Sequence, residues 1–201
     1  MRSSQKQGEL FKRSNLFGES ASSSQELIFS KKFLETWQEK IHSHQSKLFQ
    51  GIAFTNHQTS LFEENTQSDL MVEKFQPLKL TPLPLSFWRS SKPHHNGQAI
   101  YIVVDKLNES EKFIILYIGE TISADQRWKG EHDCKTYLDN YCVALQKVGL
   151  SSQLSIRFWN DVPKQTIARR KLEQGLIQKW LPPFNKETRS RWQTPFTTEI
   201  Y

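Results

Sequence analysis

Apolar positions in the second half of the chain fall into alternating strand-like and helix-like patterns. Runs rich in β-branched and aromatic residues predict buried strands at 99–104, 113–118 and 154–159. Apolar residues near helical spacing predict helices at about 124–129, 135–148 and 164–180. The polar stretch 105–111 is expected to be a hairpin loop. This order predicts an α+β domain over residues 97–190, with a small three-stranded antiparallel sheet flanked by helices.

The first half has a weaker pattern. Residues 1–25 are rich in Ser, Gln and Lys and are expected to form a disordered arm, because they cannot bury enough apolar surface to offset chain entropy. Residues 26–96 are expected to be a mostly helical and extended N-terminal extension. It has one amphipathic helix over about 26–49, capped by Ser24, then a polar loop at 55–70. Prolines exclude a helix or a central strand at 78–88, which is expected to run extended. Residues 191–201 are expected to be a C-terminal tail.

Composition excludes several classes of protein. The longest apolar runs, 99–104 and 113–118, fall far short of the roughly 20 residues that a membrane span needs. The N-terminus has no apolar stretch behind its charges, so no secretory signal is expected. Cys134 and Cys142 are too few for a disulfide framework or a four-ligand zinc site, and are expected to be small core residues. The chain is therefore predicted to be soluble, cytoplasmic and without a membrane partner.

Positive charge is concentrated near the C-terminus. The window 164–191 holds eight basic residues against Glu173 and Glu187, which accounts for the whole net charge of +6. Such a window suits a polyanion, most often nucleic acid, although a solvated helix face gives the same pattern. The residues expected to contact DNA phosphates are Lys129, Arg169, Arg170, Lys171, Lys179 and Lys186.

One carboxylate in this window is unusual. Within the helix predicted at 164–180, Glu173 falls inside the arc formed by the apolar residues. A carboxylate there is costly to desolvate unless a cation compensates it. A divalent metal ion is one candidate, and a salt bridge with Arg169, four residues earlier, is the alternative.

Four sequence features occur in an order that resembles the GIY-YIG nuclease family. Residues 99–101 read Ala-Ile-Tyr and residues 117–119 read Tyr-Ile-Gly. Arg127 follows eight residues later, where family members carry an arginine. Residues 173–185 begin with Glu, continue through Leu-Ile and Pro-Pro, and end with Asn, which is similar to the closing motif of the excision-repair members. The resemblance covers about residues 97–190.

The resemblance implies a metal-dependent DNA endonuclease or nickase that hydrolyses phosphodiester bonds. Glu173 would hold one Mg²⁺ or Mn²⁺ ion, and Arg127 would bind the scissile phosphate. Tyr101 and Tyr117 are expected to lie near each other if the strands at 99–104 and 113–118 pair. Tyr101 would act as the base, once a neighbouring metal or arginine lowers its pKa, and Tyr117 would contact the phosphate. Asn185 would position the Glu173 loop or the phosphate.

His132 lies close to the position of a family histidine and is a further candidate base. Ala99 replaces the family's first glycine, and Glu120 stands where some members carry lysine. These departures support one alternative, a DNA-binding module of the same fold that does not cut. A small interaction domain without a nucleic-acid partner is the other alternative, which the basic window disfavours.

Overall fold

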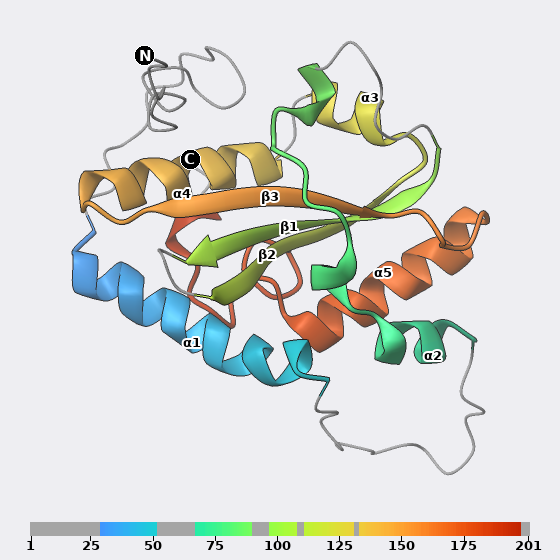
Figure 1. The fold of residues 1–201 in the computed structure, drawn as a ribbon, viewed down its shortest axis with the longest axis horizontal. Coiled ribbons are helices and arrows are strands. Elements are labelled where there is room, and N and C mark those ends of the chain that lie inside the picture. Colours follow the sequence, from blue (N-terminus) through green and yellow to red (C-terminus); the bar gives the residue numbers. More distant parts are fainter. Residues whose placement is uncertain (1–28, 52–66, 90–96, 108–110, 131–132, 198–201) are drawn as a thin grey trace, which may run out of the picture.

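The fold is an antiparallel three-stranded sheet with helices on both sides (Figure 1). The computed structural model describes residues 29–51, 67–89, 97–107, 111–130 and 133–197. The helices are α1 (Lys31–Phe49), α2 (Gln67–Lys74), α3 (Ala124–Lys129), α4 (Asp133–Lys147) and α5 (Thr166–Trp180), with short 3-10 turns η1 (Pro77–Lys79), η2 (Phe87–Arg89) and η3 (Pro195–Thr197). The strands are β1 (Ala99–Leu107), β2 (Lys112–Thr121) and β3 (Ser152–Trp159).

The sheet confirms the predicted α+β class. Strand β1 lies between β2 and β3 and is antiparallel to both. Each strand is longer than its apolar run: residues 105–107, expected in the hairpin loop, continue β1, and β2 continues past Gly119 to Thr121. Backbone pairing therefore extends the strands into polar sequence that the apolar pattern alone had assigned to a loop.

Alternate side chains of β1 enter two different cores. Tyr101 and Val103 pack on the side that α4 covers, whereas Ile100, Ile102 and Val104 pack on the side that α5 covers. Figure 1 shows α4 and α5 on opposite sides of the sheet. Because both faces of β1 are buried, its sequence over residues 99–104 is continuously apolar instead of alternating.

Helix α1 belongs to the same folded unit as the sheet. Its buried Leu34, Trp37 and Ile41 share a core with β1 and α4. The helix starts later than predicted: residues 29 and 30 are not helical, and the side chain of Ser30, not Ser24, caps it by accepting a hydrogen bond from the Phe33 N–H. Ser24 lies outside the described residues.

Two buried amide side chains cover the open edge of β2. Gln45 on α1 accepts a hydrogen bond from the Ile115 N–H at 2.7 Å and donates to the Ile115 carbonyl at 3.1 Å. Asn185, after α5, does the same at Ile118, at 2.9 and 2.8 Å. The edge strand therefore has partners for its backbone without a further strand.

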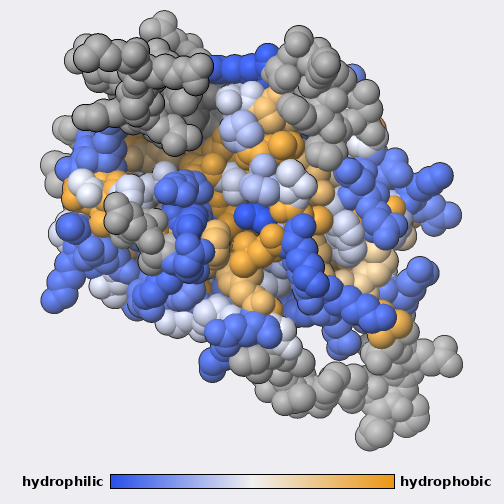
Figure 2. All heavy atoms as spheres, in the orientation of Figure 1, coloured by the Kyte–Doolittle hydropathy of each residue, from blue (hydrophilic) through white to orange (hydrophobic). Residues whose placement is uncertain are grey.

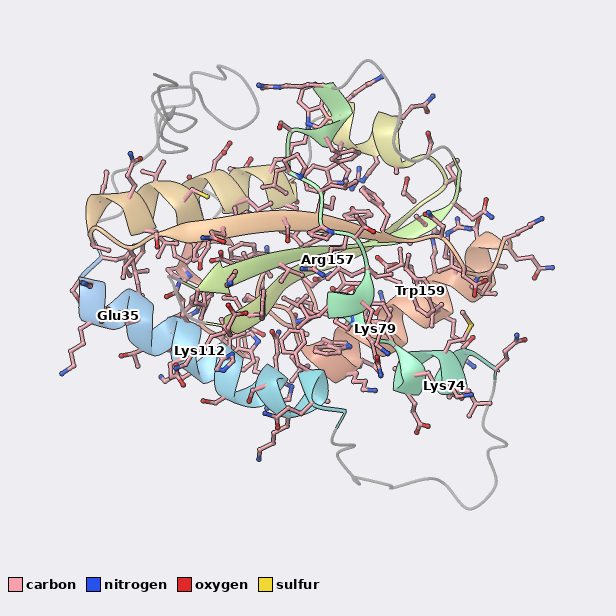
Figure 3. All side chains as sticks on the ribbon, in the orientation of Figure 1. Glu35, Lys74, Lys79, Lys112, Arg157 and Trp159 are labelled. Carbon is pink, nitrogen blue, oxygen red and sulfur yellow. The ribbon has the colours of Figure 1, made fainter. Side chains whose placement is uncertain are left out.

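The segment between α2 and β1 crosses β3 (Figure 1). Helix α2 occupies residues that the polar composition assigned partly to a loop. The proline-containing part that follows is mainly extended, as predicted, but has two 3-10 turns and a bridge between Leu83 and Ile156. Arg157 of β3 fixes η1 by donating to the carbonyls of Pro77, Leu78 and Leu80. Figure 3 shows Arg157 near Lys79 of η1, and Figure 2 shows hydrophobic residues gathered in the middle of this face. No helix among the described residues is long and apolar enough to cross a membrane.

Candidate functional site

Tyr101 and Tyr117 lie together on the α4 side of the sheet. Tyr101 is paired across the strands with Gly119, and Tyr117 with Val103, so the two tyrosines are diagonal neighbours on one face. Their rings stack with centroids 5.9 Å apart and planes 25° from parallel. The sequence motif therefore predicts the juxtaposition correctly, because antiparallel pairing of the two strands brings its halves together.

Arg127 joins the tyrosine pair from α3. Its guanidinium lies close enough to the Tyr101 hydroxyl to act on the pKa of that hydroxyl, and the Arg127 side chain is exposed. The next residue, Trp128, is fully buried and anchors the short helix edge-on against Tyr101. Lys135 holds the end of α3 by donating from Nζ to the carbonyls of Trp128 and Gly130. Arg127 thus extends from a fixed helix toward the tyrosines.

The environment of the tyrosines favours their neutral forms. Tyr101 is 1% exposed, and burial raises its pKa to about 12 even though the hydrogen bond with Arg127 acts to lower it. Burial also raises the pKa of Tyr117, and Tyr101 beside it adds to the shift. Arg127 therefore does not by itself lower the pKa of Tyr101 below its ordinary value, because desolvation outweighs the guanidinium. That a bound metal ion lowers this pKa stays a prediction.

Glu173 lies on α5, across the sheet from α4, and within electrostatic range of Tyr117. It is half-buried, beside the buried Leu172, Leu176, Ile177 and Trp180 of the predicted apolar arc. Its Oε1 accepts a hydrogen bond of 3.0 Å from the Glu120 N–H at the end of β2. Burial raises the pKa of Glu173 to about 7, and its carboxylate lies close enough to Tyr117 to raise the pKa of that hydroxyl. The carboxylate is therefore part of the site.

Arg169 pairs with Glu120, not with Glu173. Its Nε lies 2.8 Å from Glu120 Oε2, and its Nη1 donates to the carbonyls of Pro163 and Lys164. The Arg169 side chain is fully buried, so the prediction that it contacts DNA is wrong. The salt bridge considered as the alternative to a metal at Glu173 is likewise not formed by Arg169. Arg169 instead ties the start of α5 to β2.

Two other predicted site residues, Asn185 and Lys179, bond to backbone groups of the protein instead of facing a substrate. Both polar atoms of the buried Asn185 side chain bond to the Ile118 backbone, so it positions β2 and does not face a phosphate. Lys179 is half-buried and donates to the carbonyls of Val72 and Glu73, which takes it away from the solvent-exposed basic surface. His132 lies outside the described residues.

The remaining predicted DNA contacts are exposed. They are Lys129 on α3, Arg170 and Lys171 on α5, and Lys186 after it. Arg170 lies nearest to the site, with its Nε 3.3 Å from Glu120 Oε1 and its side chain 67% exposed. The basic residues near the C-terminus therefore have two roles. Arg169 and Lys179 bond to other parts of the protein, whereas Arg170, Lys171 and Lys186 are exposed to a polyanion.

A metal ion would depend mainly on Glu173. Within the part of the chain that the structure describes, no three His, Cys, Asp or Glu residues are grouped as metal ligands. The chemistry of Glu173 nevertheless fits one hard cation: it is a partly desolvated carboxylate that accepts one hydrogen bond from the described residues. Mg²⁺ typically uses one or two carboxylates and keeps several waters, which matches a site of this kind.

Sequence reasoning missed two neighbours of the site. Cys134, expected as an ordinary core residue, is buried as expected but its thiol adjoins Tyr101, Tyr117 and Arg127. Lys135 was assigned no role, although it fixes α3. Their position immediately after the segment that carries Arg127 is the only sequence signal for either role.

The chain was compared with protein-family models, curated proteins and solved structures, and it matches none of them.

Proposed function

We propose that the chain is a divalent-metal-dependent endonuclease or nickase that hydrolyses DNA phosphodiester bonds. One observation carries the proposal: Tyr101 and Tyr117 stack on each other, Arg127 of α3 lies within electrostatic range of both, and the half-buried Glu173 of α5 lies within electrostatic range of Tyr117. These are the residues that the resemblance to GIY-YIG nucleases selects. Exposed cations on α3 and α5 supply the electrostatic attraction that a DNA substrate requires.

Each side chain has a proposed task. Arg127, whose side chain is exposed, binds the scissile phosphate beside the Tyr101 hydroxyl. Tyr101 and Tyr117 act first as neutral hydroxyls that orient the attacking water and the phosphate, because burial disfavours their ionised forms. Glu173 holds one Mg²⁺ or Mn²⁺ ion, which when bound stabilises negative charge on the phosphate oxygens.

A DNA-binding module that does not cut is the second candidate function. The raised pKa values of both tyrosines favour it, because neither hydroxyl is ready to accept a proton at neutral pH. The two candidates differ in cleavage and agree in DNA binding.

Incubation of the purified chain with supercoiled plasmid tests the proposal. We expect nicked or linear DNA with Mg²⁺ or Mn²⁺ and intact plasmid with EDTA. Glu173→Gln should abolish cleavage while the protein stays folded. Glu35→Gln is the matched control, because Glu35 is an exposed glutamate on α1 whose ion pair is with Lys31. DNA binding without cleavage under every condition would favour the DNA-binding module. Absence of both DNA binding and cleavage would reject both candidate functions.

A further inference from the structure

The two most exposed large apolar side chains among the described residues flank the candidate site. Ile167 is 86% exposed and Ile122 is 70% exposed. Elsewhere in the described chain, large apolar side chains are at most about half exposed, as with Val143 at 49%. Exposed isoleucines are unfavourable in water and indicate contact with a partner when they gather at one place.

Both isoleucines are held beside the Arg169–Glu120 ion pair. Ile122 follows Glu120 by two residues, and Ile167 precedes Arg169 by two. At about 3.5 Å per residue, the backbone of each isoleucine lies within about 7 Å of the backbone of its partner in that pair, although Ile167 and Arg169 point to different faces of α5. Ile167 also shares a face of α5 with Arg170 and Lys171, three and four residues later, both of which are exposed. Ile167 therefore lies beside exposed cations, which favours DNA over an apolar protein surface as the partner.

The depth of the site adds a second reason. Tyr101 is 1% exposed and Glu173 is half-buried, whereas Arg127 extends to the surface. The backbone of a straight duplex would meet Arg127 but not reach the tyrosine and carboxylate below it. A phosphodiester could approach them only if the duplex is deformed toward the protein.

We propose that Ile122 and Ile167 wedge into the base stack of duplex DNA next to the scissile phosphodiester and bend the duplex into the site. This inference rests on the proposed nuclease function and adds a property of its substrate, which must be easily unstacked. Apolar wedges of this kind partially unstack a base step and kink the helix. Duplexes that are already unstacked, such as those with a bulge, should then be cut without help from the isoleucines.

The test compares the full-length protein with the double variant Ile122→Ser and Ile167→Ser. Val143→Ser is the matched control, because Val143 is an exposed apolar residue on α4. Cleavage is measured on an intact duplex and on the same duplex with a bulge. Bending is measured in EDTA by energy transfer between dyes at the two ends, and binding by anisotropy.

We expect the double variant to cut the intact duplex at least about tenfold more slowly than the parent and to bend it less. On the bulged duplex it should match the parent. Equal rates of the parent and the double variant on both substrates would overturn the wedge while leaving the nuclease proposal intact. A double variant that is slow on both substrates would also overturn it, because the isoleucines would then support something other than unstacking. No cleavage or binding by the parent itself would reject the nuclease function, and the wedge with it.

Discussion

Tyr101 occupies the space that a side chain on Gly119 would need. A Cβ atom built on Gly119 would lie 2.4 Å from both the Cζ and the Oη of Tyr101, its cross-strand partner. The final glycine of the Tyr-Ile-Gly motif is therefore a steric requirement of the tyrosine across the sheet, independent of any catalytic role.

Substitution of Gly119→Ala should displace the Tyr101 ring and separate it from Tyr117. Overpacking of this kind costs about 1–3 kcal/mol of the free energy of unfolding, measured by urea denaturation. Gly130→Ala is the control, because a Cβ there meets nothing within 4 Å. The control should stay within about 0.5 kcal/mol of the parent. Equal stability of the two variants would contradict the close approach.

Arg169 and Arg170 should behave differently although they are adjacent. Arg169→Met removes the buried partner of Glu120 and should lower the free energy of unfolding by about 3–5 kcal/mol. Arg170→Met should change stability by about 1 kcal/mol or less, because its pair with Glu120 is largely exposed. If Arg170 contacts a phosphate, its loss should reduce the slope of log K against log salt by about one unit. Similar stability losses in the two variants would contradict this assignment.

Arg127 should matter more for chemistry than for binding. Its guanidinium lies within electrostatic range of Tyr101 and Tyr117, and its contact with the phosphate should strengthen as charge builds on the phosphate oxygens. Arg127→Ala should bind DNA within about tenfold of the parent, yet lose on the order of 10²–10³ in single-turnover cleavage rate. Arg127→Lys should restore little, because lysine lacks the planar fork. Normal cleavage by the alanine variant at saturating DNA would make Arg127 a binding residue only.

Glu173 should make stability depend on pH in a definite direction. Burial raises its pKa from 4.5 to about 7, so the folded state binds the proton more tightly than the unfolded state. Its contribution to stability is therefore lost as the pH rises from about 4.5 through about 7. In metal-free buffer, Glu173→Gln should gain stability relative to the parent across this window. Taking the difference between the two proteins removes the similar effects of Asp105 and Asp139, whose pKa values burial also raises, to about 6.

The same pair of proteins reports on the metal. Above this window, Mg²⁺ or Mn²⁺ should raise the melting temperature of the parent, because a ligand that binds only the folded state stabilises it. It should leave Glu173→Gln unchanged. A stability difference that is constant with pH, or an equal response to the metal, would argue against the half-buried carboxylate as the metal ligand.

Gln45 should be essential to the fold, although it lies in the N-terminal extension. Gln45→Leu would leave the Ile115 N–H and the carbonyls of Ile115 and Trp180 without their partner. Each unsatisfied buried group costs about 1–3 kcal/mol, so urea unfolding should show a loss of at least about 2 kcal/mol. Gln174→Leu, which removes only an exposed bond to Glu187, should have little effect. If Gln45→Leu leaves the free energy of unfolding unchanged, the edge of β2 does not depend on α1.

The sequence by itself predicted the sheet and most of its helices. Strands that are buried on both faces need continuous apolar runs, and amphipathic helices need apolar residues at helical spacing, so both can be recognised locally. The same local patterns predicted that Tyr101 and Tyr117 would meet and that Glu173 would lie beside an apolar arc, and the structure has both features.

Only the tertiary structure decided how the charged and amide side chains are used. Arg169 and Arg170 each add one positive charge to the sequence. Arg169 is buried against Glu120 whereas Arg170 is exposed, because the two side chains point in different directions from α5. Gln45 and Asn185 likewise gave no local signal for the edge of β2, since their partners are about 70 residues away. Hydrophobic patterning acts within one element, whereas the partner of a polar group depends on which elements the packing brings together.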